Sequence, residues 1–124
     1  MLAHRRILLA TAAILALAGT QQGDIAESQA TARLFGMHTP ISSLKSYMGH
    51  TLGACGALEA WISIEMMREG WFAPTINLEQ VDGECAALDY IAGEGRALQC
   101  EYVMSNNFAF GGINTSLIFK RYVK

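Results

Sequence analysis

Charged residues are scarce in this 124-residue chain, in which only 16% of the residues are Asp, Glu, Lys or Arg. The nine Lys and Arg residues are dispersed and the formal net charge is -2, so the chain has no basic stripe of the kind that attracts phosphate backbones or anionic membranes. We therefore expect neither a nucleic-acid partner nor a membrane partner. Hydrophobic residues make up 52% of the chain, which argues against disorder and predicts one domain with its own core.

Cysteines are few and unpaired in pattern. Cys55, Cys85 and Cys100 are too far apart in sequence to form a CxxC motif. Three cysteines are also an odd number, so they cannot all be paired in disulfides within the chain. Cysteine usage thus favours a reducing compartment, and we expect a cytoplasmic protein.

The first 18 residues indicate a different location, because they resemble a secretory signal. A basic start, His4-Arg5-Arg6, precedes the apolar run "ILLATAAILAL", and Ala16-Leu17-Ala18 fits the A-x-A cleavage pattern. The run is too short to span a bilayer as a helix. The alternatives are a buried strand or the altered front of a longer gene. We accordingly divide the chain into a signal-like segment, residues 1–18, and a domain, residues 19–124.

Two helices are predicted. The stretch 24–36 has Asp24 as a possible N-cap, Glu27 three residues later and Gly36 as a stop, with one apolar face expected to be buried. A second helix is expected over 51–69, with a first half rich in small residues that suggests close packing on all sides. A short strand is expected between the helices, an extended stretch over 71–76, a loop-rich connection over 77–98, and an antiparallel pair of strands over 101–104 and 113–119.

A cation and an imidazole stand just before the second predicted helix. His50 lies near the positive end of the helix dipole, which favours a neutral imidazole able to donate a hydrogen bond, and Lys45 adds positive potential. Such a pair can stabilise negative charge on a carbonyl oxygen. Glu59, on the helix, can hold Lys45 in place. In the alternative interpretation His50 only caps the helix, Lys45 is solvated and Glu59 faces water.

The second candidate place is "NNFAFGGIN", residues 106–114. Gly111 and Gly112 allow the backbone to present amide groups to a ligand, while Phe108 and Phe110 would line an apolar cleft. The alternative is a glycine hairpin with two core aromatics. Cys55, inside a small-residue helix, is interpreted as a packed hydrophobe and not as a nucleophile.

Four motifs in order carry a family resemblance. They are "GTQQGDIAES" at 19–28, "KSYMGHTLGACGALEA" at 45–60, "APTIN" at 73–77 and "MSNNFAFGGINTSLIFKR" at 104–121. In sequence and spacing they resemble the β-ketoacyl-(acyl carrier protein) synthases. The resemblance covers 19–122 and corresponds to the last part of such an enzyme. It implies an α/β fold: the C-terminal half of a thiolase-like fold, with a mixed β-sheet packed with helices.

The resemblance also implies roles for individual residues. The family condenses an acyl group held on a cysteine with malonyl carrier protein after decarboxylation. In that scheme His50 steadies the enolate, Lys45 orders the site and Glu59 pairs with Lys45. Phe110 would gate the acyl pocket and, beside Gly111 and Gly112, help to form the oxyanion hole. The expected partners are acyl carrier protein and a ketosynthase chain or a second copy; no cofactor and no metal are expected.

Two departures from the family pattern limit this function. No residue occupies the place of the nucleophilic cysteine, and Ala16 stands where the family has its other histidine. We therefore expect this chain not to catalyse the complete condensation by itself. The resemblance weakens the signal interpretation, since cleavage after Ala18 would cut into a motif. Three hypotheses follow: the C-terminal segment of a ketosynthase, a non-catalytic partner subunit, or a small exported protein that reuses the fold.

Overall fold

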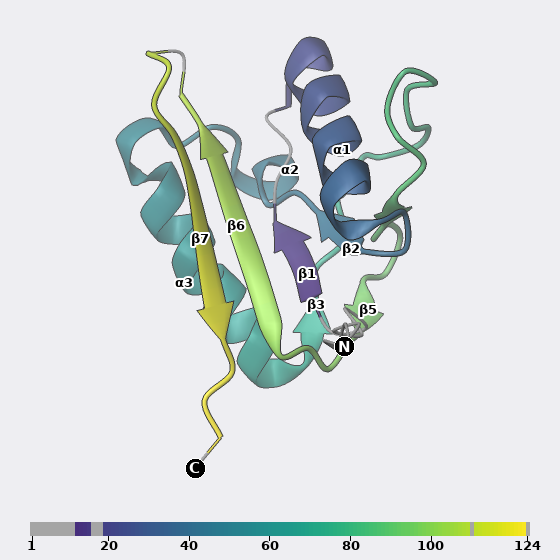
Figure 1. Cartoon of the computed structure of the whole chain (residues 1–124). Helices are drawn as coiled ribbons and strands as arrows, with labels where there is room; N and C mark the ends of the chain where they lie inside the picture. Colours follow the sequence, from purple (N-terminus) through teal and green to yellow (C-terminus); the bar gives the residue numbers. More distant parts are fainter. Residues whose placement is uncertain (1–11, 16–18, 110, 124) are drawn as a thin grey trace, which may run out of the picture.

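The computed structural model describes residues 12–15, 19–109 and 111–123. It is built around a five-stranded sheet, most of which can be followed in Figure 1. The strand order is β4-β2-β1-β6-β7; β4, β2, β1 and β6 pair in parallel, and β7 is antiparallel to β6. This is the mixed sheet expected from the resemblance. The strands of the sheet are β1 (Ala12–Leu15), β2 (Pro40–Ser42), β4 (Asp89–Tyr90), β6 (Tyr102–Phe108) and β7 (Asn114–Lys120).

The apolar run near the start of the chain contributes the central strand. The backbone of Ala12–Leu15 pairs with β2 on one side and with β6 on the other. A strand is one of the alternatives predicted for this run, whereas the proposed cleavage site at residues 16–18 lies outside the described residues. No helix in the described part of the chain is long and apolar enough to cross a membrane.

Helix α1 (Gln21–Phe35) begins three residues earlier than predicted. Thr20 is its N-cap, and the Thr20 side chain accepts a hydrogen bond from the Gly23 N–H. Asp24 does not cap the helix; one of its carboxylate oxygens instead accepts the Gly19 N–H at 3.0 Å. The helix ends at Gly36, as predicted, where φ is 83°.

The buried face of α1 is partly polar: Ala32 and Phe35 pack against the core as predicted, but the most deeply buried side chains of the helix are polar. Glu27, Ser28 and Thr31 are buried, whereas Leu34 is 75% exposed. The burial is tolerated because the polar groups find partners: Ser28 Oγ accepts the Ala86 N–H at 3.1 Å, and Glu27 bonds to a side chain of β6. The apolar spacing therefore identified the buried side of this helix through Ala32 and Phe35 but wrongly placed Leu34 on it.

The second predicted helix is divided into three parts. A single turn, α2 (Lys45–Met48), is followed by the 3-10 turn η1 (Leu52–Ala54) and by α3 (Cys55–Glu69). Helix α3 ends as predicted at Gly70, which is in the left-handed conformation. The start is irregular because Gly49 and Leu52 both have positive φ, at 67° and 52°.

Helix α3 packs one face against the sheet and leaves the other open, so the predicted close packing on all sides is wrong. The inner face contributes Met66 and Met67 to a core formed with Leu44, Phe72, Ile91, Cys100 and Val103. On the outer face of α3 Trp61 is 61% exposed, and in the preceding turn η1 no atom lies within 4 Å of where a Cβ on Gly53 would be.

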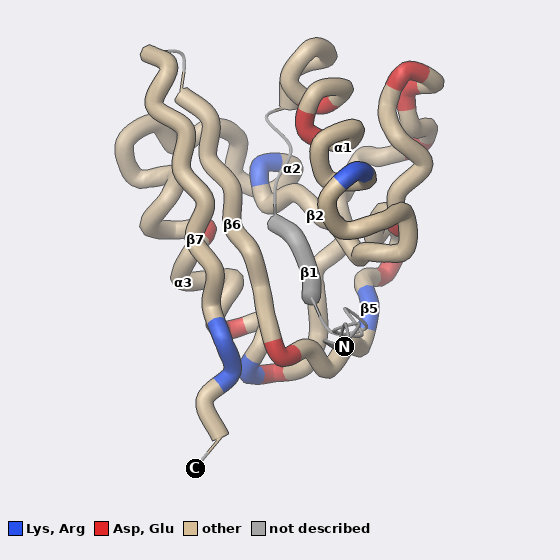
Figure 2. Tube along the Cα trace, viewed as in Figure 1, with Lys and Arg blue, Asp and Glu red and all other residues tan. Residues whose placement is uncertain are grey.

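Two short strands, β3 (Trp71–Phe72) and β5 (Arg96–Ala97), form a separate antiparallel pair within the stretch predicted as extended and loop-rich. The C-terminal antiparallel pair is confirmed, although β6 is longer than predicted and its hairpin with β7 ends in the turn 109–113. Charged residues are absent from most of this hairpin (Figure 2). The hairpin therefore forms a long, uncharged margin of the sheet.

Candidate active site

The two candidate places meet at one end of the sheet. In open sheets with parallel strands, ligands bind outside the carboxyl ends of the strands, at the point where the chain connections diverge. Here β1 connects through α1 to β2 on one side and pairs with β6 on the other. Shortly after the end of β2 comes Lys45, and β6 ends at Phe108. The topology thus brings together segments about 60 residues apart.

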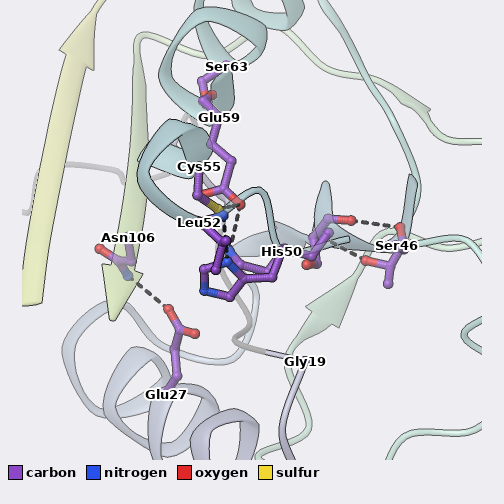
Figure 3. Close-up of polar contacts among 12 residues, drawn as sticks. Gly19, Glu27, Ser46, His50, Leu52, Cys55, Glu59, Ser63 and Asn106 are labelled. Atoms are coloured by element: carbon purple, nitrogen blue, oxygen red, sulfur yellow. Dashed lines mark hydrogen bonds and ion pairs between the residues drawn. The ribbon is translucent and has the colours of Figure 1, made fainter. Parts of the chain in front are cut away.

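Lys45 and Glu59 form a buried ion pair. The Lys45 Nζ lies 2.6 Å from Glu59 Oε1, and the two side chains are 13% and 5% exposed. Cys55 donates its S–H to the same oxygen at 3.4 Å, as Figure 3 shows around Glu59. The alternative with a solvated lysine and a glutamate facing water is therefore wrong. Because the Lys45 side chain is largely shielded from water, its positive charge is weakly screened and acts strongly on neighbouring groups.

His50 is oriented by the backbone that follows it. Its Nδ1 accepts the Leu52 N–H at 2.9 Å (Figure 3). In the neutral ring the proton must then be on Nε2, which is left as a hydrogen-bond donor. Leu52 itself has a positive φ, which is an energetically unfavourable backbone conformation for a leucine. The contact also satisfies an N–H at the start of η1, so His50 caps this turn through Nδ1 while Nε2 stays available as a donor.

A cavity of about 240 Å³ adjoins both groups. Its wall combines polar groups on the inner side with exposed apolar side chains at the rim, where Leu52 is 78% and Ile113 72% exposed. Such a mixture suits a ligand with a polar reacting group and an apolar body. The lining residues are Lys45, His50, Leu52, Cys55, Gly56, Asn107, Phe108, Ala109, Ile113 and Thr115.

The glycine connection closes the hairpin beside this cavity. The Ala109 N–H donates to the Ile113 carbonyl at 3.1 Å, and the Gly112 N–H donates to the Ala109 carbonyl at 2.9 Å. Gly112 has φ 81°, which favours glycine at this place. Phe108 is 46% exposed and lines the cavity, so it is not a core aromatic. Phe110, the other predicted aromatic, lies outside the described residues.

Several cavity residues were not predicted. Asn107 and Thr115 are paired across β6 and β7, and both line the cavity. Strand alternation starting from Phe108 would have placed Asn107 on the opposite face, so no local signal in the sequence indicated these residues. Asn107 also lies over Gly56 of α3, where a Cβ would be 3.6 Å from the amide nitrogen. The described part of the chain has no group of three or more His, Cys, Asp or Glu residues that could hold a metal ion.

Comparison with known proteins agrees with this geometry. The family model for the β-ketoacyl synthase, C-terminal domain, matches residues 15–79. The chain belongs to the β-ketoacyl synthase family. Over 106 residues it is 42% identical to 3-oxoacyl-[acyl-carrier-protein] synthase 2 of Synechocystis sp., a match that covers 83% of this chain and 25% of that protein. The chain therefore spans about a quarter of the length of the curated relatives it matches.

Solved ketosynthase structures share the fold. A β-ketoacyl synthase from Burkholderia phymatum STM815 superimposes with a TM-score of 0.88 and 69% identity, covering 92% of this chain and 28% of that one. A complex named AntDE:AntF, of a type II polyketide acyl-carrier protein with its ketosynthase, matches with a TM-score of 0.81 and 28% identity, covering 91% of this chain and 28% of that one. The thiolase-like α/β fold implied by the resemblance is thus confirmed.

Proposed function

We propose that this chain supplies the enolate-stabilising part of a β-ketoacyl-(acyl carrier protein) synthase site, acting in fatty acid or polyketide synthesis. The observation that carries the proposal is one cavity lined by both Lys45 and His50, in which the His50 ring keeps its Nε2–H as a donor. Membership in the family supports the reaction class.

The proposed step is the decarboxylation of a malonyl thioester. The bond between the methylene carbon and the carboxylate breaks, carbon dioxide leaves, and the electron pair moves to the thioester carbonyl oxygen as an enolate. The His50 Nε2–H donates to that oxygen. The enolate carbon then attacks the carbonyl carbon of an acyl thioester, and the thiolate of that thioester leaves. A fixed donor aimed at developing charge lowers the barrier because it does not need to reorganise.

Lys45 adds positive potential beside the same oxygen. Its pairing with Glu59 holds the ammonium group in place and still leaves two of its three protons for the cavity. Phe110, Gly111 and Gly112 are proposed to complete the site from the hairpin, by gating the acyl group and donating backbone N–H groups. The described residues offer no assigned nucleophile, since Cys55 is buried and donates to Glu59. The acyl-carrying thiol is therefore proposed to come from outside them.

The proposed partners follow from the same reaction. Acyl carrier protein would deliver the malonyl group, as the complex AntDE:AntF illustrates for a related ketosynthase. A ketosynthase chain or a second copy would cover the open outer face of α3, where Trp61 is exposed. We place the reaction in the cytoplasm, and we propose that the domain predicted over residues 19–124 includes β1 in its sheet.

Complementation tests the proposal. The Burkholderia phymatum synthase would be expressed without the region that this chain matches and mixed with this chain and malonyl carrier protein. Mass spectrometry would follow acetyl carrier protein, which forms when no acyl thioester is supplied and the enolate carbon takes a proton from water. We expect the mixture to be active, and His50→Ala in this chain to lower the rate on the order of 100-fold, the usual loss for an oxyanion donor.

A variant at an exposed residue that does not line the cavity, Glu79→Gln, is the control and should keep the rate of the unmodified mixture. Equal rates for the His50→Ala mixture and the control would refute the assignment of His50. An inactive mixture in which the two pieces nevertheless co-purify would refute the proposed function.

A further inference from the structure

A chain of polar side chains runs from α1 to β7 on the face of the sheet away from the cavity, and it is buried at Glu27 and Asn106 and exposed at Ser116. Asn106 Nδ2 donates to Glu27 Oε1 at 3.1 Å, and Ser116 Oγ donates to Asn106 Oδ1 at 2.6 Å. Glu27 and Asn106 are only 5% and 7% exposed. Figure 3 shows the first of these bonds, between the helix below and the strand above it.

We propose that Glu27 is a positioning residue, which acts through Asn106 and Ser116 to hold the glycine turn against the cavity. The inference rests on the proposed function, because it assigns to Glu27 a role at the same site. It goes further, since Glu27 lines no part of the cavity and belongs to none of the site residues predicted from the sequence.

The two hydrogen bonds run in one direction, from the Ser116 hydroxyl through the Asn106 amide to the Glu27 carboxylate. An amide side chain presents one donor end and one acceptor end, and here the donor faces the carboxylate while the acceptor faces the hydroxyl. A carboxylate at Glu27 cannot donate, so it selects this orientation of Asn106. The Oδ1 that results is the atom to which Ser116 is bound. The side chain at position 27 therefore influences the hydrogen bonding of residues on both β6 and β7.

Strand register connects this chain to the cavity. Asn106 is paired with Ser116, and the next pair toward the turn, Asn107 and Thr115, points to the opposite face and lines the cavity. The β7 strand is the edge of the sheet, and residues 114–118 are all exposed. Backbone pairing with β6 holds β7 along its length, and the bond from Ser116 adds a side-chain link from this end of the hairpin to Asn106 and, through it, to α1.

The test uses the amide signals of Gly111 and Gly112 in a ¹H–¹⁵N NMR spectrum, together with the decarboxylation assay. We expect Glu27→Ala and Ser116→Ala to move both glycine signals and to lower kcat about tenfold, the effect of a misplacement well under 1 Å. Glu27→Gln keeps an oxygen acceptor for Asn106 and should restore both readouts. Ser116→Ala lies on the exposed edge strand, so it gives an answer even where a variant of the buried Glu27 does not fold.

Ser28→Ala is the matched control. Ser28 is also buried on α1 and accepts a backbone N–H, but from Ala86 in the connecting loop. Its loss should lower the melting temperature and leave the glycine signals and kcat unchanged. Glycine signals that do not move in Glu27→Ala, or that move equally in Ser28→Ala, would overturn the proposal. The NMR result needs no catalysis, so it separates this proposal from a failure of the proposed function.

Discussion

At the scale of single residues, the site depends on a charge pair that is removed from water. Lys45 and Glu59 are 14 positions apart in sequence and are 13% and 5% exposed. Burial of such a pair is costly, and removal of one partner leaves the other charge uncompensated. The pair therefore constrains which substitutions the site tolerates.

We expect Lys45→Met to destabilise the fold by about 3 kcal/mol, because Glu59 would be left as an isolated buried carboxylate. The double variant Lys45→Met/Glu59→Leu should recover most of that loss. Urea unfolding of the two single variants and the double variant would measure the coupling. Additive losses in the three variants would contradict the interpretation as a coupled pair.

The second prediction at this scale concerns pH. A hydrogen bond from Arg96, aided by its charge, holds the pKa of Asp89 below its usual value, against the opposing effect of partial burial. A lowered pKa in the folded state gives stability that is present above the unfolded pKa and is lost as the pH falls through the folded one. The pair is about one third exposed, so we expect Asp89→Asn to cost only about 0.5 kcal/mol at pH 7.

The difference in unfolding free energy between Asp89→Asn and the unmodified chain should shrink as the pH falls through the lowered folded-state pKa of Asp89, and disappear once both states bind the proton. Denaturant unfolding at several pH values would show this. A difference that is constant from neutral to acidic pH would mean that the ion pair is not its source.

Sequence analysis identified the chemistry of the residues better than their contacts. Lys45 and His50 do line one cavity, as their charge and their place before a helix predicted. The Leu52 N–H that sets the His50 tautomer was not predictable, because a leucine with positive φ contradicts the usual preference. Glu27 was seen only as part of a capping pattern, since partners 79 positions apart leave no local signal.

At the scale of elements, long helices with clear ends were predicted well and short strands poorly. Gly36 and Gly70 end their helices as expected. The β3–β5 pair has two residues in each strand, too few for an alternating pattern to be visible. It is held by packing, because a Cβ on Gly95 would lie 2.5 Å from Trp71 Cζ2 and 2.7 Å from the Phe72 carbonyl oxygen.

Gly95→Ala should therefore destabilise the fold by about 3 kcal/mol, through the clash and the positive φ together. Gly93→Ala is the control, since Gly93 also has positive φ but has open space around it, and should cost about 1 kcal/mol. Thermal unfolding would compare the two variants. Equal losses would show that only the backbone conformation matters at Gly95.

At the scale of the whole molecule, the sheet needs its central strand. Because β1 joins β2 to β6, a chain that begins at Gly19 should lose the sheet and not fold, whereas one that begins at Thr11 retains β1. Circular dichroism and NMR dispersion of the two truncated chains would test this. A folded chain from Gly19 would contradict it and would restore the exported-protein hypothesis.

The same strand order has a consequence for synthesis on the ribosome. Ala12 is paired with Tyr102, so one edge of the central strand has no neighbour until nearly the whole polypeptide has been translated. Contacts so distant in sequence form slowly, and the unpaired edge meanwhile invites intermolecular association. The nascent protein should accordingly depend on chaperones. Its soluble yield in cells should rise at low growth temperature and when ribosome-associated chaperones are overproduced.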